Sequence, residues 1–288
     1  MIVRPGARMS SFGFTYDNWG VNPSATPGTS VIPGASNVEG AWTQIASGAN
    51  IAQDCYWVYF QVFAGSSTGA IKNHLLDIGI DPAGGTSYTA FLSNLDVGET
   101  PSLAQAGNRE YLFPIYIKSG SSVAVRVQGS NATAGTVRIA ARFYGHPLYP
   151  NTVPVGTFAQ TLGTITNSQG PTVTPGNAAD GTWLDLGALT RDMFWFQLGY
   201  GIDSITITAE YTYFEVAYGD ATNKTTIMKV MHGGTTAETC GMAMQTSMLA
   251  CAAYQPAPAG ANIYVRARCQ NAPDTGYHVN VVAIGGIA

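Results

Sequence analysis

Residues 120–126, Gly-Ser-Ser-Val-Ala-Val-Arg, recur in altered form at residues 260–266, Gly-Ala-Asn-Ile-Tyr-Val-Arg. In both stretches a glycine turn precedes apolar residues at every second position, which is the periodicity of a half-buried β-strand. Asn131-Ala132 and Asn271-Ala272 continue the match at the same separation along the chain. The same turn–strand unit therefore occurs twice in this sequence.

Earlier parts of the chain repeat in the same order. The matched landmarks are Pro33-Gly34 and Gly40-Ala41-Trp42 with Pro175-Gly176 and Gly181-Thr182-Trp183, then Phe60-Gln61-Val62 with Phe196-Gln197-Leu198, and His74–Ile78 with Tyr213–Val216. Ordered matches at a nearly constant separation are the signature of an internal repeat. The sequence therefore predicts a tandem duplication of a unit of roughly 125–140 residues.

Each copy has the pattern of short strands separated by turns. Residues 136–142 and 277–284 alternate apolar and polar side chains, and segments rich in Gly, Pro, Ser and Asn separate such stretches. No stretch carries the sustained apolar stripe of an amphipathic helix. We predict an all-β protein of two tandem β-sandwich domains, jelly-roll-like and derived from the internal duplication, with about seven or eight strands in each.

The expected domain organisation follows from the repeat. Residues 1–22 form an N-terminal arm or first strand, 23–146 the first β-sandwich, 147–155 a Pro-containing linker and 156–288 the second β-sandwich. The first segment is either the opening strand of its sandwich or an arm that adds to a neighbour's sheet edge. Its candidate interface residues are Arg4, Arg8, Phe12, Phe14, Tyr16 and Trp19.

Charge is scarce along the whole chain. Charged residues make up 10% of the 288 residues, against about 25% in an average soluble domain. With 13 Lys and Arg, 17 Asp and Glu and no basic stripe, the chain lacks the electrostatic footprint of a nucleic-acid-binding protein. No apolar run is long enough to span a membrane, and no signal peptide is recognisable. We expect a protein made in the cytoplasm that binds neither nucleic acid nor membrane.

The sequence predicts no catalytic residue, cofactor or metal. Gly65-Ser66-Ser67-Thr68-Gly69 matches a nucleophile elbow literally, but it lies in a Gly/Ser-rich turn rather than between a strand and a helix. The four histidines and the four cysteines have no metal-ligand spacing, and we expect buried thiols, with the redox state left open. These residues are His74, His146, His232 and His278, and Cys55, Cys240, Cys251 and Cys269.

Two sets of charged residues recur in both copies. Asp77 and Asp81, with Glu215 and Asp220 as their counterparts, are candidates for a structural calcium, although solvated loop charges are the favoured interpretation. Arg126 and Arg266 point away from the apolar faces of their strands. They are either repeated anion contacts or, as the favoured interpretation, charges at strand edges that discourage sheet-to-sheet aggregation.

One hairpin carries a family resemblance. The segment 113–130, Phe-Pro-Ile-Tyr-Ile-Lys-Ser-Gly-Ser-Ser-Val-Ala-Val-Arg-Val-Gln-Gly-Ser, resembles a strand–turn–strand in virion structural proteins of tailed bacteriophages. The resemblance covers these residues well and the rest of the chain only in its low charge and tandem sandwiches. It implies a location in the virion and, as partners, copies of the chain itself and other virion proteins such as the major capsid protein. By analogy, a trimer is the expected oligomer.

The resulting hypothesis is a non-enzymatic virion structural protein that decorates or cements a bacteriophage capsid through symmetric protein–protein contacts. The alternative is a tail or fibre component that binds host-surface glycan through aromatic platforms. A glycan-active enzyme is the third hypothesis and would need a suitably spaced pair of carboxylates. The sequence leaves open the position on the particle, the oligomer order, and whether a glycan is bound.

Overall fold

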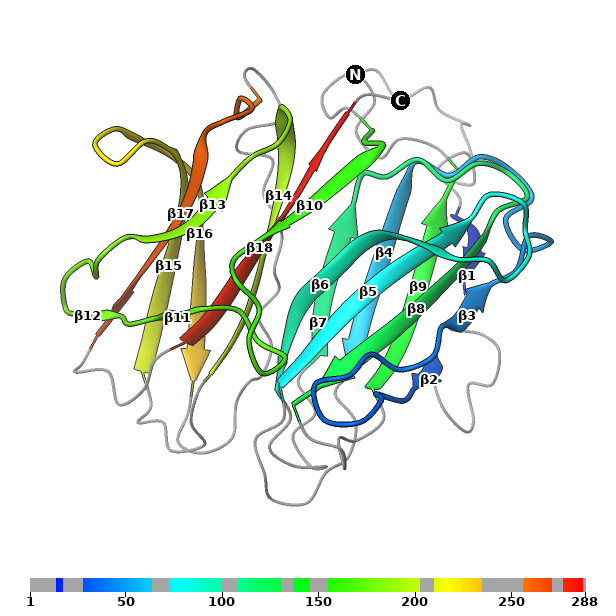
Figure 1. Ribbon diagram of the computed structural model, residues 1–288, viewed down its shortest axis with the longest axis horizontal. Helices are drawn as coiled ribbons and strands as arrows, with labels where there is room; N and C mark the ends of the chain where they lie inside the picture. The colour runs from blue at the N-terminus through cyan, green and yellow to red at the C-terminus, as the bar shows by residue number, and fades with distance from the viewer. Residues whose placement is uncertain are drawn as a thin grey trace, which may run out of the picture.

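The computed structural model describes residues 14–17, 28–63, 73–99, 108–130, 137–145, 155–202, 210–234, 256–270 and 277–286. Within these ranges every regular element is a β-strand. A helix of the length and apolarity needed to cross a membrane does not occur in this part of the chain. The strands form four sheets arranged as two sandwiches (Figure 1), so the prediction of an all-β fold is confirmed.

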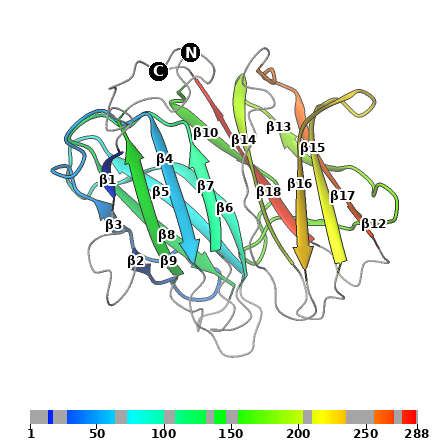
Figure 2. The same ribbon diagram turned by 180° about the vertical axis from the view of Figure 1, so that it is seen from behind.

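The first sandwich is a jelly roll with one added strand. Its first sheet, called here the β9 sheet, has the order β1-β9-β4-β7, with β2 also paired to β9. The second, the β8 sheet, has the order β3-β8-β5-β6 and faces the first (Figure 2). Strands β2 to β9 in these two orders make the eight-stranded jelly roll. The strands are β1 (Phe14–Asp17), β2 (Thr29–Val31), β3 (Thr43–Ala46), β4 (Trp57–Phe63), β5 (Asn73–Asp81), β6 (Thr89–Glu99), β7 (Asn108–Phe113), β8 (Ser122–Gly129) and β9 (Val137–Tyr144).

The second sandwich repeats this arrangement. The β18 sheet has the order β10-β18-β14, with β11 also on β18, and the β17 sheet has the order β13-β17-β15-β16, with β12 also on β17. The strands are β10 (Phe158–Leu162), β11 (Thr172–Val173), β12 (Gly176–Asn177), β13 (Leu184–Ala188), β14 (Met193–Ile202), β15 (Glu210–Gly219), β16 (Lys224–Gly234), β17 (Asn262–Cys269) and β18 (Tyr277–Gly285).

Strand order and register agree between the two sandwiches. The order β3-β8-β5-β6 corresponds to β13-β17-β15-β16, and β10 pairs with β18 as β1 pairs with β9. Asp77 lies opposite Arg126 in the first sandwich, and Glu215 lies opposite Arg266 in the second. Unrelated sandwiches also share strand orders, so the duplication of the sequence stays a prediction, whereas the structural equivalence of the positions is observed.

The alternating pattern that opens the sequence forms a central strand. In β8, Val123, Val125 and Val127 are fully buried between the two sheets, while Arg126 and Gln128 lie on the opposite, outer face and are partly exposed. Because successive side chains of a strand point to opposite faces, the apolar set packs into the core and the polar set stays outside.

The two sandwiches share one hydrophobic cluster. Phe194, Trp195, Val282 and Ile284 of the second sandwich pack into the core of the first. The rings of Trp57 and Trp195 meet edge to face with centroids 5.2 Å apart. Figure 1 accordingly shows the β18 sheet lying between the β17 sheet and the first sandwich. The two sandwiches are therefore packed together rather than merely tethered.

The segments predicted to flank the sandwiches are described only in part. Phe14–Asp17 pairs with β9 of the same chain, while the choice between a first strand and an arm for residues 1–22 stays a prediction. Arg4, Arg8, Phe12 and Trp19 lie outside the described residues, and the interface role of the whole set stays a prediction. Most of the predicted linker, residues 147–154, also lies outside the described residues. Gly156, just after the linker, bonds to the first sandwich at residues 114–116.

Candidate functional site

A compact cluster surrounds Arg126 on the outer face of the β8 sheet. Its guanidinium donates from Nε to Asp77 Oδ2 at 2.9 Å, and Nη2 lies 2.8 Å from the same oxygen. Nη1 lies 2.5 Å from Glu39 Oε2, and the group stacks over the Trp42 ring at 4.5 Å from its centroid. One cation thus joins strand β5, strand β8 and the loop before β3.

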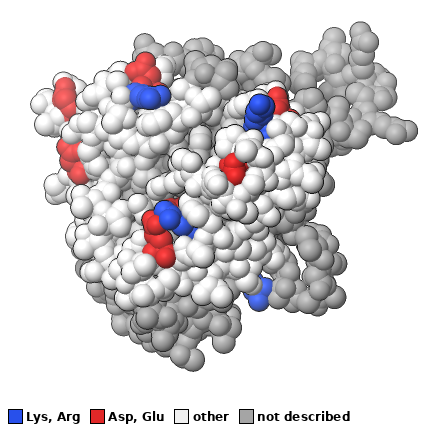
Figure 3. Space-filling model, turned by 45° about the vertical axis from the view of Figure 1, so that its right-hand side comes forward, with Lys and Arg blue, Asp and Glu red and all other residues white. Residues whose placement is uncertain are grey.

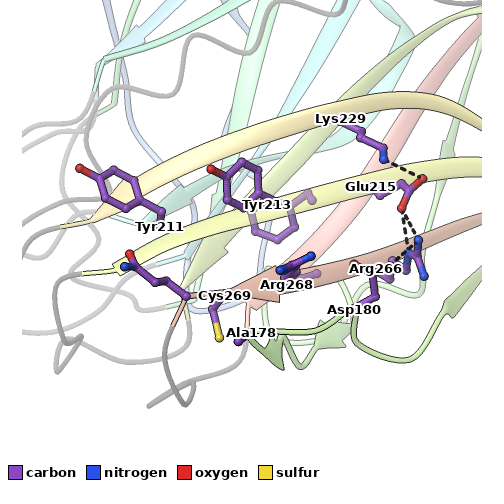
Figure 4. Close-up of a pocket in the computed structure, with 12 residues that line it drawn as sticks. Ala178, Asp180, Tyr211, Tyr213, Glu215, Lys229, Arg266, Arg268 and Cys269 are labelled. Atoms are coloured by element: carbon purple, nitrogen blue, oxygen red, sulfur yellow. Dashed lines mark hydrogen bonds and ion pairs between the residues drawn. The ribbon is translucent and has the colours of Figure 1, made fainter.

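The second sandwich carries the same cluster around Arg266. Its Nε and Nη2 donate to Glu215 Oε2 at 2.8 and 2.6 Å, and Nη2 also lies 2.8 Å from Asp180 Oδ2. The guanidinium stacks over the Trp183 ring at 4.4 Å from its centroid. Figure 4 shows Arg266 between the two carboxylates.

The sequence basis of both clusters is an acidic residue followed by Gly, any residue and Trp. Glu39-Gly-Ala-Trp42 and Asp180-Gly-Thr-Trp183 occupy equivalent loops. The glycine N–H of each loop donates to the central strand, from Gly40 to Val127 and from Gly181 to Ala267, at 2.9 Å in both cases. A Cβ on either glycine would lie within 2.7 Å of backbone oxygen, so the close approach requires glycine.

The pKa values of Glu39 and Glu215 are shifted in opposite directions by their surroundings. Burial and the neighbouring Asp77 charge raise the pKa of Glu39, and Arg126 only partly offsets them. Burial would also raise the pKa of Glu215, but hydrogen bonds from Thr226 and Arg266 and the charge of Arg266 lower it overall. A carboxylate that accepts several charge-assisted bonds prefers its ionised form. The bonds from Thr226 and Arg266 therefore favour the ionised form of Glu215 in the folded protein.

The interpretation of Arg126 and Arg266 as strand-edge charges is wrong. β8 has paired strands on both sides, β3 and β5, and β17 lies between β13 and β15. Both guanidiniums are engaged with carboxylates of the same chain. Their shared role is to fasten the loops that carry Glu39 and Asp180 to the middle of a sheet.

A groove of about 490 Å³ lies beside the Arg266 cluster on the outer face of the β17 sheet. Tyr211 and Tyr213, two residues apart on β15, are 55% and 49% exposed, and Met231 beside them on β16 is 57% exposed. Figure 4 shows both tyrosine rings standing on this face. The groove is lined by Ala178, Asp180, Tyr211, Tyr213, Phe214, Glu215, Lys229, Arg266, Ala267, Arg268, Cys269 and Gln270.

The groove combines flat rings with positive charge. Arg268 is exposed, and the Lys229 side chain is 69% exposed with Nζ 3.6 Å from Glu215 Oε1. Such a surface can stack planar or apolar groups and hydrogen-bond polar ones. This groove was not predicted from the sequence, because Tyr211 and Tyr213 have the pattern of ordinary strand residues and only the fold shows that they are exposed. Their spacing of two along β15 was the available signal.

The candidate calcium ligands are used by the protein's own donors. Asp81 accepts the Ala83 and Ser87 N–H groups, both at 2.9 Å, and so closes the turn after β5. Asp220 accepts N–H bonds from Asn223 and Thr222, which lower its pKa. Across the described ranges, no group of three or more His, Cys, Asp or Glu residues is placed to hold a metal ion.

The remaining candidates lie apart from this groove. His278 is fully buried, with Nδ1 2.6 Å from Asp96 Oδ2 between the two sandwiches, and His74 is buried on β5. Cys55 and Cys269 are buried thiols. Only the backbone of His232 is described. The segment Gly65–Gly69, His146, Cys240 and Cys251 lie outside the described residues.

Comparison with known proteins adds no family. No family model matches the chain, and no curated protein does. Similar solved structures include Sulfolobus Turreted Icosahedral Virus, at 9% identity over 88% of this chain and 87% of that chain, with a TM-score of 0.38. The CBM22-1-CBM22-2 tandem domain of Paenibacillus barcinonensis Xyn10C covers 96% of this chain and 98% of its own at 10% identity and a TM-score of 0.29. A structure of infectious bursal disease virus, Gt strain, covers 82% of this chain and 59% of its own at 12% identity and a TM-score of 0.26.

Proposed function

We propose that this protein is a non-enzymatic structural protein of a virion, which decorates or cements a bacteriophage capsid through symmetric contacts with copies of itself and with the major capsid protein. It is made in the host cytoplasm and incorporated into the particle. The observation that supports this proposal best is the chain's construction as one block, in which two jelly rolls share a hydrophobic cluster.

The surface of this block supports the same proposal. On the face shown in Figure 3, the charged side chains are few and separated by broad uncharged areas. Arg126 and Arg266 are neutralised within the chain by carboxylates. A rigid, charge-poor body presents large surfaces that a neighbour can cover without desolvating unpaired charges. This is a suitable surface for permanent protein contacts.

The direct test is binding to particles. Purified protein is mixed with phage particles from which it has been stripped, and co-sedimentation and imaging of the particles measure its return. We expect saturable binding at a fixed number of copies per particle. An unrelated protein of matched size and net charge serves as the control. If the protein binds neither capsids nor tails, the proposal is overturned.

A second candidate function is glycan binding by a tail or fibre component. The observation that favours it is the pair of exposed rings, Tyr211 and Tyr213, beside the hydrogen-bonding groups of the groove. Sugars stack their apolar faces on such rings. An oligosaccharide array probed with the wild type and with Tyr213→Ala tests it. Binding that depends on Tyr213 would support this function over capsid decoration.

A further inference from the structure

Part of the outer face of the β8 sheet, beside the Arg126 cluster, is covered by the second sandwich. Leu75 points outward from β5, yet it is only 1% exposed. Gln128, directly opposite Leu75 on β8, donates from Nε2 to Ser168 Oγ at 3.1 Å, and Asn73 donates to the Gln169 side chain. The loop between β10 and β11 thus seats on this face. We call Asn73, Leu75, Asp96 and Gln128 the first socket.

The contact extends to strand β6 through Asp96. Its Oδ2 lies 2.6 Å from His278 Nδ1 and accepts the Gly170 N–H at 3.3 Å. Its backbone N–H donates to Asn280 Oδ1 at 3.1 Å. Asp96, His278 and Asn280 are all fully buried. The first socket is therefore closed by a loop and by β18 of the second sandwich.

The second sandwich has the same four positions on its β17 sheet. Tyr213 lies opposite Arg268 on the neighbouring strand, as Leu75 lies opposite Gln128. On its other side Tyr213 lies opposite Met231, as Leu75 lies opposite Asp96. The equivalents of Asn73, Leu75, Asp96 and Gln128 are Tyr211, Tyr213, Met231 and Arg268. We call these four residues the second socket.

The two sockets differ in what covers them. Three positions of the first socket are buried, with Asn73 7%, Leu75 1% and Asp96 0% exposed. Their equivalents in the second socket are about half exposed, and Arg268 is exposed as well. Tyr211, Tyr213 and Arg268 of the second socket line the groove of about 490 Å³, and Met231 lies beside it, paired with Tyr213. Ala178, which also lines the groove, is the equivalent of Asn37, whose side chain accepts a bond from Ser168 Oγ in the first sandwich. The groove therefore lies where a protein loop sits in the first sandwich.

The composition of the second socket fits burial rather than exposure. Among the described residues, five large hydrophobic side chains are exposed, and Tyr211, Tyr213 and Met231 account for three of them. Exposed aromatic and methionine side chains gathered in one place are typical of interface centres. Tyr211, Tyr213 and Met231 therefore indicate a surface that a partner covers rather than one that faces solvent.

We propose that the second socket binds the first sandwich of a second copy of this chain, repeating between molecules the contact that joins the two sandwiches within one. The occupant of the first socket is a jelly roll, and the first sandwich of each molecule is a jelly roll of the same strand order. The contact is heterologous, because the two surfaces differ, so it continues from copy to copy and ends only where a ring closes. This inference does not depend on the proposed place in a virion.

Analytical ultracentrifugation of the full chain tests the inference. We expect association that increases with concentration and passes beyond the dimer. Tyr213→Asp and, independently, Met231→Lys should each weaken the association constant about tenfold or more, since each puts a charge at the centre of an apolar contact. Both positions are exposed, so thermal unfolding of each variant should match the wild type.

Ile32→Ser is the matched control. Ile32 is 68% exposed on the first sandwich, and its equivalent, Thr174, is exposed although the second sandwich is docked. The position therefore lies outside the proposed contact, and this variant should associate like the wild type. A monomer at all concentrations would overturn the inference. So would Tyr213-dependent glycan binding by a monomer, which would assign the groove to sugar. Either result leaves the particle-binding test of the proposed function unaffected.

Discussion

At the scale of single residues, Asp77 and Glu215 are the carboxylates that lie opposite Arg126 and Arg266 in the two sandwiches. Their side chains are only 4% and 13% exposed, so water screens neither carboxylate well. Arg126 and Arg266 supply the opposing charge and stack on a tryptophan at the same time. Removing the cation would leave a buried carboxylate uncompensated, which costs more than the pair itself contributes.

Replacing either arginine by methionine tests this dependence. Arg126→Met and Arg266→Met each keep the apolar stem over the tryptophan and remove the charge. We expect each to lower the free energy of unfolding by about 2–4 kcal/mol in urea titrations. Lys229→Met is the control, because its exposed ammonium should contribute less than about 1 kcal/mol. Equal effects of all three variants would contradict this account.

The pH dependence of stability should separate Glu215 from Glu39. Because the pKa of Glu215 is lowered on folding, its ionised form stabilises the protein above the ordinary Glu pKa of 4.5, and this contribution is lost as pH falls through the lowered value. Glu215→Gln should therefore be destabilising at pH 7, and its difference from the wild type should shrink steadily in acid. Urea midpoints between pH 3 and pH 7 measure this.

Glu39 is the matched comparison with the opposite sign. Its pKa is raised on folding, so its protonated form is favoured in the native state and that advantage is lost as pH rises past the raised value. Glu39→Gln should accordingly be tolerated better relative to the wild type at pH 7 than at pH 4. Parallel pH profiles for the two variants would rule out the assigned shifts.

At the scale of elements, the turns before β8 and β17 are set by equivalent glycines. Gly120 and Gly260 have φ values of +83° and +84°, and a Cβ at either would meet no atom within 4 Å. The requirement is therefore conformational and not one of space. Both turns place the first residue of a central strand, which explains why this glycine opens both copies of the repeated stretch.

Substitutions at Gly120 should rank by their tolerance of positive φ. Gly120→Asn should lower the free energy of unfolding by less than about 1 kcal/mol, because Asn adopts this region most readily after Gly. Gly120→Val should cost about 1–3 kcal/mol more, because a β-branched residue is strained there. Thermal and urea unfolding give the ranking, and the same pair at Gly260 should reproduce it. A Val variant as stable as the Asn variant would refute the conformational explanation.

Individual strands were largely predictable from period-two patterns, but their neighbours were not. The stretch after Gly120 was expected to be a strand with Arg126 facing outward, and both features are observed. Its expected place at a sheet edge is wrong, since β3 and β5 flank it. Alternation reports which face is apolar, whereas the position of a strand within its sheet depends on pairings between residues far apart in sequence.

At the scale of the whole molecule, the shared hydrophobic cluster couples the stability of the two sandwiches. Trp195 is 3% exposed and belongs to the second sandwich, yet it packs on Trp57 in the core of the first. Arg109 of β7 also donates across the contact to the Tyr200 carbonyl. We therefore expect one cooperative unfolding transition for the wild type, coincident by circular dichroism and fluorescence.

Trp195→Ala should break this coupling. The cavity should lower stability by about 3–5 kcal/mol, and unfolding should separate into two transitions as each sandwich melts alone. Trp183→Ala is the control, because Trp183 stacks on Arg266 at the outer face and takes no part in the shared cluster. It should leave the transitions coincident. Two separate transitions in the wild type would show that the sandwiches are not coupled.

The sequence by itself determined the all-β class and the outward direction of Arg126 and Arg266, because local periodicity specifies which face of a strand is apolar. It did not determine what those arginines bind, nor that Leu75 is covered while its equivalent Tyr213 is open. Those facts depend on how the second sandwich docks on the first, through contacts such as Asp96 with His278, 182 residues apart. Only the tertiary structure brings such residues together, because no local pattern encodes the docking of one sheet against another.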